Sequence, residues 1–196
     1  MEQSEHARLN ALDEELQAMR GFLKAGAKLY VSRDRQEMLE AILAHARTLT
    51  RAESGSLYVV QDDVLKFVAV QNDKLTSSQI SELLLDSEIP VHNDSLAGFV
   101  ASTIQIVNIA DSHNPPAGAP FRINVEKAMA ADYDIRSILA IPLSCPNGDC
   151  VGVLQLINHI GSDGRIGPFP EDEPTGLTSL ASMAAVSIHN SLLQEQ

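Results

Sequence analysis

The first fifty residues carry apolar positions at the three- and four-residue spacing of helices. Residues 1–33 predict a helix with a heptad seam, which is typical of a dimerising coiled coil and equally of an amphipathic helix that packs on its own domain. A second helix is expected from about Asp34 to Arg51, because Asp34 and Glu37 form a capping box ahead of an apolar stripe. The positions of the heptad seam are Leu9, Leu12, Leu16, Met19 and Leu23.

Strand patterns begin after this second helix. Residues 54–61 and 65–72 alternate or run apolar on either side of Asp62 and Asp63, which predicts a first hairpin. A crossover helix, a strand, a helix and a strand are then expected over residues 73–86, 88–91, 95–103 and 106–109. Asp94 is the expected N-cap of the last of these helices.

Residues 135–145 and 150–160 are the two most apolar segments and predict adjacent central strands. Asn147 and Gly148 lie between them and form the dipeptide that is preferred in a two-residue type I′ turn. The two segments are therefore expected to form a second hairpin in the middle of the sheet.

Irregular segments and a final helix complete the pattern. A long loop rich in Pro, Gly and Asn starts near Asp111 and leads to a helix expected at 125–131, and residues 161–167 form a glycine-rich excursion. An apolar stripe from Leu177 to Leu192 predicts the last helix. The order of elements indicates an α/β (α+β) domain with one mostly antiparallel sheet, helices on both faces and a pocket under the irregular segment.

Charge and composition exclude several functions. The chain of 196 residues has 26 acidic and 14 basic residues and a formal charge of -12, so it repels nucleic acid and anionic lipid surfaces. Its N-terminal residues are too charged for a signal peptide, and no apolar stretch reaches the roughly 20 residues of a membrane span, which predicts a cytoplasmic protein. Two cysteines are too few for a secreted disulfide framework.

A succession of segments between about residues 36 and 194 resembles the GAF domain family. The segments are SGSLYVV, SLAGFVAST with IVNIAD, RSILAIPL, VGVLQLIN and PFPEDEPTGLTSLASMAAVSIHNSLL. The resemblance implies a six-stranded antiparallel sheet, terminal helices on one face, a ligand cavity roofed by short helices and loops on the other, and dimer contacts through the flanking helices. The sequence is most similar to bacterial input domains that precede HD-GYP phosphodiesterases, cyclases or kinases. Residues 1–33 are then expected to be a dimerisation helix or coiled-coil linker, and residues 34–196 a GAF domain with a C-terminal signalling helix.

Some cyclic-nucleotide-binding members of this family carry an Asn-Lys, Phe, Asp-Glu signature, which this sequence matches in part. Asn158, Phe169, Asp172 and Glu173 occupy comparable positions. His159 stands where the signature has Lys, and the spacing from Phe169 to Asp172 is one residue short. The resemblance implies that the Lys and Asp lock the sheet to the last helix, so a neutral His159 would give a weaker, pH-dependent link. These departures do not support cyclic-nucleotide binding, and no cofactor is predicted.

The pocket expected under the roof draws on several parts of the sequence. The helix after Asp94 offers exposed N–H groups for an anion or carbonyl group, arginines could fork onto a carboxylate or phosphate, and aromatic rings could stack on a planar ligand. The alternative is that Phe121 and Tyr133 fill the core and that the arginines pair with nearby acids. The candidate residues are Ser95, Ala97, Gly98, Phe99, Asp111, Phe121, Arg122, Asn124, Tyr133 and Arg136.

Cysteines and histidines offer little catalytic chemistry. Cys145 and Cys150 flank the predicted turn at matching positions, close enough for a disulfide in principle, and the alternative is two reduced, partly buried thiols. No histidine pair has metal-ligand spacing, although His92 or His113 could hold a haem, as in some sensor members of the family. No Ser-His-Asp constellation or phosphate-binding glycine motif is present in the sequence, so neither a metal nor an enzyme activity is predicted.

These patterns together predict a non-catalytic regulatory domain that senses a small molecule. Occupancy of the pocket would order the roof, shift the last helix and reach an output domain through the paired terminal helices of a homodimer. Two alternatives stay open. One is a ligand-free dimerisation scaffold, and the other is a cysteine-dependent methionine sulfoxide reductase of the GAF fold.

Overall fold

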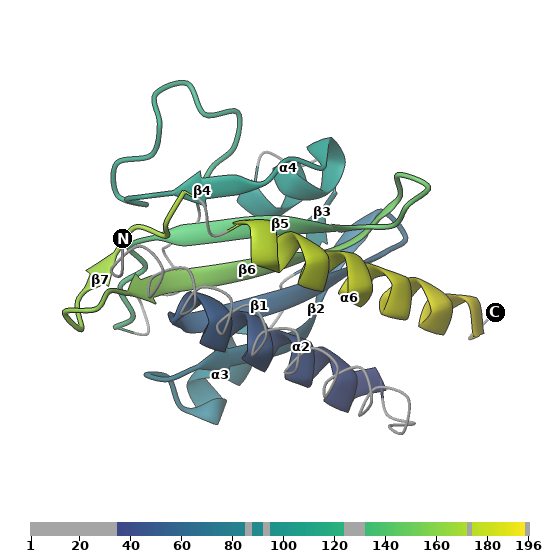
Figure 1. The fold of residues 1–196 in the computed structure, drawn as a ribbon, viewed down its shortest axis with the longest axis horizontal. Helices are drawn as coiled ribbons and strands as arrows, with labels where there is room; N and C mark the ends of the chain where they lie inside the picture. Colours follow the sequence, from purple (N-terminus) through teal and green to yellow (C-terminus); the bar gives the residue numbers. More distant parts are fainter. Residues whose placement is uncertain (1–34, 85–87, 92–94, 124–131, 172–173, 195–196) are drawn as a thin grey trace, which may run out of the picture.

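The computed structural model describes residues 35–84, 88–91, 95–123, 132–171 and 174–194 (Figure 1). The helices are α2 (Arg35–Thr50), α3 (Ser77–Leu84), α4 (Leu96–Thr103) and α6 (Pro174–Gln194). The strands are β1 (Ala52–Gln61), β2 (Val64–Asn72), β3 (Ile89–Pro90), β4 (Val107–Ile109), β5 (Ile138–Ser144), β6 (Cys150–Ile160) and β7 (Ile166–Gly167). The helices predicted for residues 1–33 and 125–131 lie outside the described residues. The other predicted helices and strands are confirmed to within a few residues.

Strands β1 to β6 form one antiparallel sheet in the order β3-β2-β1-β6-β5-β4, which confirms the sheet that the resemblance implies. β7 is an additional short strand that the sequence analysis missed. Its residue Ile166 pairs with Ile160 of β6, and Gly167 pairs with His159. Ala52 of β1 occupies the other side of His159. β7 therefore continues the row of β5 along β6, and its two residues are too few to show an alternating pattern.

The pleat of the sheet separates two apolar cores. On one face, Leu57 and Leu139 pack with α2 and α6, which lie side by side in Figure 1. On the other face, Tyr58 and Ile138 pack in a cluster with residues of α4. Adjacent residues of one strand point to opposite faces, so each strand contributes to both cores. The predicted arrangement, with the long helices on one face and shorter elements on the other, is confirmed for these helices.

Helix α6 is 21 residues long and amphipathic. Its buried positions follow the predicted three- and four-residue spacing and include Leu177, Leu180, Ala184 and Ile188. Val186, on another side of the helix, is 43% exposed. None of the described helices combines the length and the apolar character that crossing a bilayer requires.

The first hairpin closes through a type I′ turn. Asp62 and Asp63 have φ angles of 54° and 60°, and Gln61 pairs with Val64 directly across them. Two consecutive left-handed residues define this turn type, and aspartate tolerates that conformation better than most residues. The predicted hairpin is confirmed.

The second hairpin has a different turn from the predicted one. Gly148 has φ 91°, whereas Asn147 is not among the residues with positive φ, and the Gly148 N–H donates to the Cys145 carbonyl at 2.9 Å. The loop is therefore a type I turn followed by a left-handed glycine, with three residues (146–148) between Cys145 and Asp149, which are joined by a hydrogen bond from the Cys145 N–H to the Asp149 carbonyl. The predicted type I′ turn is wrong because Pro146 fixes the φ angle of the first turn position near the value of a type I turn.

The extra loop residue places the two cysteines on opposite faces of the sheet. Cys150 pairs with Ser144 rather than with Cys145. The Cys145 thiol is buried on the α6 side, 3.7 Å from the Ala185 carbonyl, while Cys150 packs with the cluster on the α4 side. The prediction that the thiols occupy matching positions is wrong. Both cysteines are free, in agreement with the reduced alternative.

Candidate functional site

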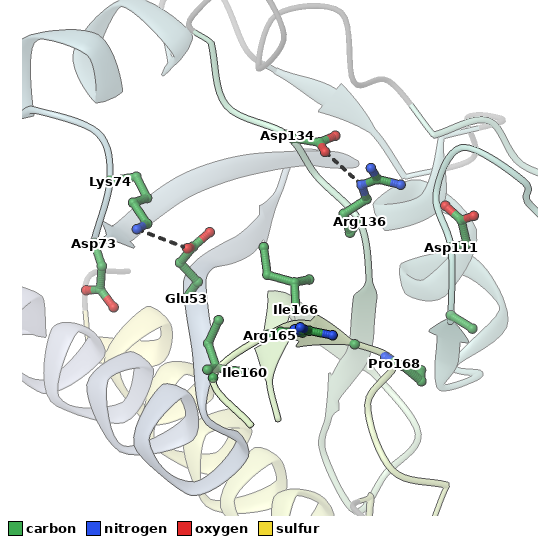
Figure 2. Close-up of a pocket in the computed structure, with 13 residues that line it drawn as sticks. Glu53, Asp73, Lys74, Asp111, Asp134, Arg136, Ile160, Arg165, Ile166 and Pro168 are labelled. Atoms are coloured by element: carbon green, nitrogen blue, oxygen red, sulfur yellow. Dashed lines mark hydrogen bonds and ion pairs between the residues drawn. The ribbon is translucent and has the colours of Figure 1, made fainter. Parts of the chain in front are cut away.

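A polar cleft of about 950 Å³ opens at one end of the sheet, where β1 begins and β6 ends (Figure 2). Its walls come from the loop after β2, the loop after β4, the segment before β5 and the turn that leads into β7. A cleft of this size and polarity is suited to a small polar molecule. The charged side chains that line it are Glu53, Asp73, Lys74, Asp111, Asp134, Arg136 and Arg165.

Asn158 of β6 holds the floor of this cleft together. It is fully buried and has φ 60°, a left-handed conformation that asparagine tolerates better than most side chains. Its Nδ2 donates to Glu53 Oε2 at 3.1 Å and to the Asp134 carbonyl at 2.8 Å. Its Oδ1 accepts from the Arg136 N–H at 2.7 Å. One buried side chain thereby fixes three residues that line the cleft.

Glu53 of the cleft wall and Tyr133 both contact the Asn158 side chain. Glu53 is 8% exposed and faces Lys74, with 3.9 Å between Oε1 and Nζ. Tyr133 is 5% exposed, and its hydroxyl lies 3.4 Å from Asn158 Nδ2. Burial, and next the negative charge of Glu53, raise the pKa of Tyr133 above the ordinary tyrosine value. Tyr133 therefore stays neutral and keeps its hydroxyl proton at physiological pH.

Asp134 pairs with two basic side chains at the rim of the cleft. Its Oδ2 accepts from Arg136 Nε at 2.7 Å, and its Oδ1 lies 2.8 Å from His113 Nε2. The hydrogen bond with His113, followed by the one with Arg136, lowers the pKa of Asp134. The aspartate is thus held in its ionised form and orients the Arg136 side chain.

The Asp111 carboxylate accepts hydrogen bonds from residues of its own loop. Its Oδ2 accepts from Asn114 Nδ2 at 2.8 Å, and its Oδ1 accepts from the His113 N–H at 3.0 Å. These two bonds, the one from Asn114 first, lower the pKa of Asp111. The ionised carboxylate shapes the cleft wall through the loop that it stabilises.

Arg47 connects the cleft to helix α2. Its side chain is 14% exposed, and its Nη2 lies 2.6 Å from Asp73 Oδ1 and 2.7 Å from the Glu53 carbonyl. Nη1 reaches Gln71 Oε1 at 3.3 Å, while the buried Nε has no hydrogen-bond partner among the described residues. The sequence analysis missed Arg47, Glu53 and Asp73, because an arginine on an amphipathic helix and acids at strand ends carry no motif.

The Leu96 and Gly98 N–H groups at the start of α4 already have hydrogen-bond partners in the protein. Ser95 is the N-cap, rather than the predicted Asp94, and its Oγ accepts from the Gly98 N–H at 3.1 Å. The Leu96 N–H donates to the Arg122 carbonyl at 3.1 Å. Within the described residues, the backbone at this helix end is thus engaged by Ser95 and Arg122, which form part of the fold around α4.

Aromatic rings at the same place pack against one another. Phe99 and Phe121 have ring centroids 5.1 Å apart in a tilted arrangement, beside the buried Ala97. Both rings are partly buried and pack against the apolar cluster on the α4 side. Of the predicted pocket residues, Asp111 and Arg136 line the cleft, Tyr133 lies beneath it, Ser95, Ala97, Gly98, Phe99, Phe121 and Arg122 gather around α4, and Asn124 lies outside the described residues.

The partial signature falls on the structural link between β6 and the helices. Phe169 is 2% exposed, with its ring centroid 5.5 Å from that of His159. His159 Nδ1 lies 2.7 Å from the Thr50 carbonyl at the end of α2. Asp172 and Glu173 lie outside the described residues, and with them the predicted link from His159 to Asp172.

The two thiols are far from the cleft. Cys150 begins β6 and Ile160 ends it, which separates them by about 30 Å at the rise of an extended strand. Burial raises the pKa of both Cys145 and Cys150, which reduces the fraction of reactive thiolate.

Within the part of the chain that the structure describes, no three His, Cys, Asp or Glu side chains converge as metal ligands. His113 pairs with Asp134, and His92 lies outside the described residues.

The chain is similar to part of a much longer phosphodiesterase. The profile of the GAF domain family matches residues 34–188. The dual 3′,5′-cyclic-AMP and -GMP phosphodiesterase 11A of Takifugu rubripes is 26% identical over 181 residues, which cover 83% of this chain and 18% of the relative. The chain thus spans less than a fifth of that relative's length.

Solved structures share the same fold. The GAF domain of a phosphoenolpyruvate-protein phosphotransferase from Coxiella burnetii superposes with a TM-score of 0.69 at 17% identity, over 92% of this chain and 97% of that one. Free methionine-R-sulfoxide reductase from Neisseria meningitidis superposes with a TM-score of 0.64 at 16% identity, over 90% and 91% of the two chains. Domains with this fold are generally regulatory, although some are enzymes. The match of the family profile to most of the chain, together with the shared fold, shows that the chain belongs to the GAF domain family.

Proposed function

We propose that this GAF domain is a regulatory module that binds a small molecule in the cleft and transmits its occupancy to helices α2 and α6. The observation that carries the proposal is the position of Arg47, a residue of α2 whose side chain contacts Asp73 and Glu53 of the cleft wall. A ligand that binds beside Asp73 in the cleft changes the position or the surroundings of the carboxylate that Arg47 holds. The ligand can shift the helix only if it favours one of two arrangements of this contact.

Transmission beyond α2 relies on the core that it shares with α6. Leu43 of α2 and Leu180 of α6 belong to one buried cluster, so a displacement of one helix changes the packing of the other. In the full-length protein, we expect these helices to pair with those of a second copy and to act on an output domain. The much greater length of the phosphodiesterase relative supports such a domain arrangement.

Cyclic AMP and cyclic GMP are the first compounds to test, because the Takifugu rubripes relative is a dual 3′,5′-cyclic-AMP and -GMP phosphodiesterase. The sequence favours neither, since His159 replaces the lysine of the cyclic-nucleotide signature. A wider set of phosphorylated and carboxylated metabolites therefore belongs in the same screen.

The test combines native mass spectrometry with hydrogen–deuterium exchange. Mass spectra under gentle and denaturing conditions reveal a co-purifying molecule and the oligomeric state, and thermal shift then ranks the compounds. The expected result is a bound compound that changes deuterium uptake over residues 35–50 and 174–194. A dimer that no compound stabilises would support the scaffold alternative. Reduction of free methionine sulfoxide that is lost in Cys150→Ser would support the reductase alternative.

A further inference from the structure

The carboxylates of the cleft already have partners within the protein. Formed hydrogen bonds and ion pairs make these carboxylates poor ligands for an incoming cation, because binding would have to break them. The partners are Arg47 for Asp73, Asn158 for Glu53, Asn114 for Asp111, and His113 with Arg136 for Asp134.

Two guanidinium groups of the cleft, by contrast, keep unused donors. Arg136 contacts Asp134 through Nε, and no described residue accepts a hydrogen bond from its terminal nitrogens. The side chain of Arg165 makes no hydrogen bond or ion pair with the described residues, although its backbone is fixed by Asp163 and Gly161. An ordered turn thus presents an unoccupied guanidinium to the cleft.

The sheet brings these two arginines within reach of one ligand. The strand that follows Arg136 first pairs with β6 at Ile157, and the strand that follows Arg165 first pairs with β6 at Ile160. Three residues of extended strand, about 10 Å, separate these pairing points. Figure 2 shows the two side chains on neighbouring walls of the cleft. Two long arginine side chains can converge on a small group across such a distance.

We propose that Arg136 and Arg165 form an anion site that takes the phosphate or carboxylate group of a small molecule. The inference rests on the proposed function, because it names the ligand class of the same cleft. Planar guanidinium groups bind such groups through paired N–H donors. The formal charge of -12 repels polyanions such as nucleic acids, so the ligand is a small anion.

The test is a titration of the whole chain with sodium phosphate, and separately with sodium acetate, at constant ionic strength. The side-chain Nε–H signals of the arginines are followed by NMR. Saturable shifts are expected for Arg136 and Arg165 and not for Arg122, which lies beside α4. Tighter binding of phosphate assigns a phosphoryl ligand, and tighter binding of acetate assigns a carboxylate. Equal, linear shifts of all three signals would overturn the site.

Variants make the assignment specific. Arg136→Gln and Arg165→Gln are each expected to weaken phosphate binding at least about tenfold, because each removes charged hydrogen bonds to the anion. Both side chains are exposed, so the variants should keep the fold. Lys66→Gln removes the same charge from β2, where Lys66 pairs with Glu88, and should change the affinity by less than about twofold. Unchanged affinity in both arginine variants would exclude the site.

The same samples separate this inference from the proposed function. A screened compound that stabilises the wild type and both arginine variants equally would uphold the small-molecule site and overturn the anion assignment. Saturable phosphate binding without altered deuterium uptake in α2, even with the tightest compound of the screen, would uphold the anion site and overturn the proposed transmission.

Discussion

Arg47 Nη2 and Asp73 Oδ1 lie 2.6 Å apart, although the arginine side chain is 14% exposed and the aspartate side chain 63% exposed. The pair therefore spans the distance from the interior side of α2 to the wall of the cleft. A solute in the cleft can reach Asp73 directly, whereas Arg47 is held by the Glu53 carbonyl as well. Changes at the exposed partner are thus felt by a helix that the solute never touches.

Replacing Arg47 should uncouple α2 from the cleft. Arg47→Met keeps the apolar stem of the side chain and removes the donors to Asp73 and the Glu53 carbonyl, which should lower the free energy of unfolding by roughly 2 kcal/mol. Ligand binding should persist, while the ligand-dependent change in deuterium uptake over residues 35–50 disappears. Urea denaturation and hydrogen–deuterium exchange measure the two effects.

Arg51→Met is the matched control for that variant. Arg51 is exposed, and its side chain donates to the Gly161 carbonyl at 3.0 Å rather than to Asp73. The control should keep both the stability and the ligand response of α2. A ligand response in Arg47→Met as large as in the wild type would show that the signal takes another path.

Asn158 should be among the most sensitive positions in the chain. Asn158→Ala leaves Glu53 Oε2, the Asp134 carbonyl and the Arg136 N–H without their partner, and it places alanine at a left-handed φ of 60°. The expected loss is on the order of 3 kcal/mol in the free energy of unfolding. Asn158→Gly should recover roughly 1 kcal/mol of it, because glycine adopts the left-handed conformation without strain.

Asn147→Ala serves as the control at an exposed asparagine, whose side chain bonds only with Asp149. Its expected loss is below about 1 kcal/mol. Urea denaturation of the three variants gives the comparison. Similar losses for Asn158→Ala and Asn147→Ala would mean that the buried hydrogen bonds contribute little.

Gly152 of β6 allows a close approach of the β1 backbone. A Cβ atom at this position would lie 2.2 Å from the Tyr58 carbonyl oxygen, at the point where the register of β1 and β2 shifts. Gly152→Ala must therefore displace backbone in the centre of the sheet and should cost about 3 kcal/mol or more. Gly167→Ala in β7, where a Cβ meets nothing within 4 Å, should cost less than about 0.5 kcal/mol. Equal midpoints of urea denaturation for the two variants would contradict the close approach.

Most of the sheet could be predicted because each strand supplies two cores and therefore shows a clear apolar pattern. The turn of the second hairpin and the start of α4 were predicted wrongly, because each depends on a single residue. Pro146 selects a type I turn ahead of Gly148, although Asn147 and Gly148 favour a type I′ turn. Ser95 and Asp94 are adjacent, good N-cap residues, and only the hydrogen bond with the Gly98 N–H shows which one starts α4.

The cleft was harder to predict because its residues come from strand ends, where periodicity ends. Glu53, Asp73 and Arg165 follow no motif, and the antiparallel pairing of β2, β1, β6 and β7 brings them together. Asn158 is different, because the partial signature drew attention to it. Its role in the fold, with three cleft residues bound to one buried amide, depends on contacts that the sequence does not encode locally.

The buried tyrosines should make the domain sensitive to alkaline pH. Burial raises the pKa of Tyr58 and Tyr133 above the ordinary value of 10.0, and Glu53 adds to the effect at Tyr133. Below pH 10 the tyrosine hydroxyls are protonated in both the folded domain and the unfolded chain, so the contribution of the neutral tyrosines to stability is fully present. Above pH 10 the unfolded chain loses protons that the folded domain keeps, and stability falls as the pH rises.

Tyr133→Phe removes one of these ionisations and isolates its contribution. The variant should lose roughly 1 kcal/mol at pH 8, because the hydroxyl no longer interacts with Glu53 and Asn158. Between pH 10 and 11, however, its stability should fall less steeply than that of the wild type, by up to about 1.4 kcal/mol per pH unit. Urea denaturation at several pH values gives the slopes, and absorbance at 295 nm follows tyrosine ionisation directly. If wild type and variant lose stability at the same rate, Tyr133 ionises within the folded domain, and its hydroxyl is not held neutral beneath the cleft.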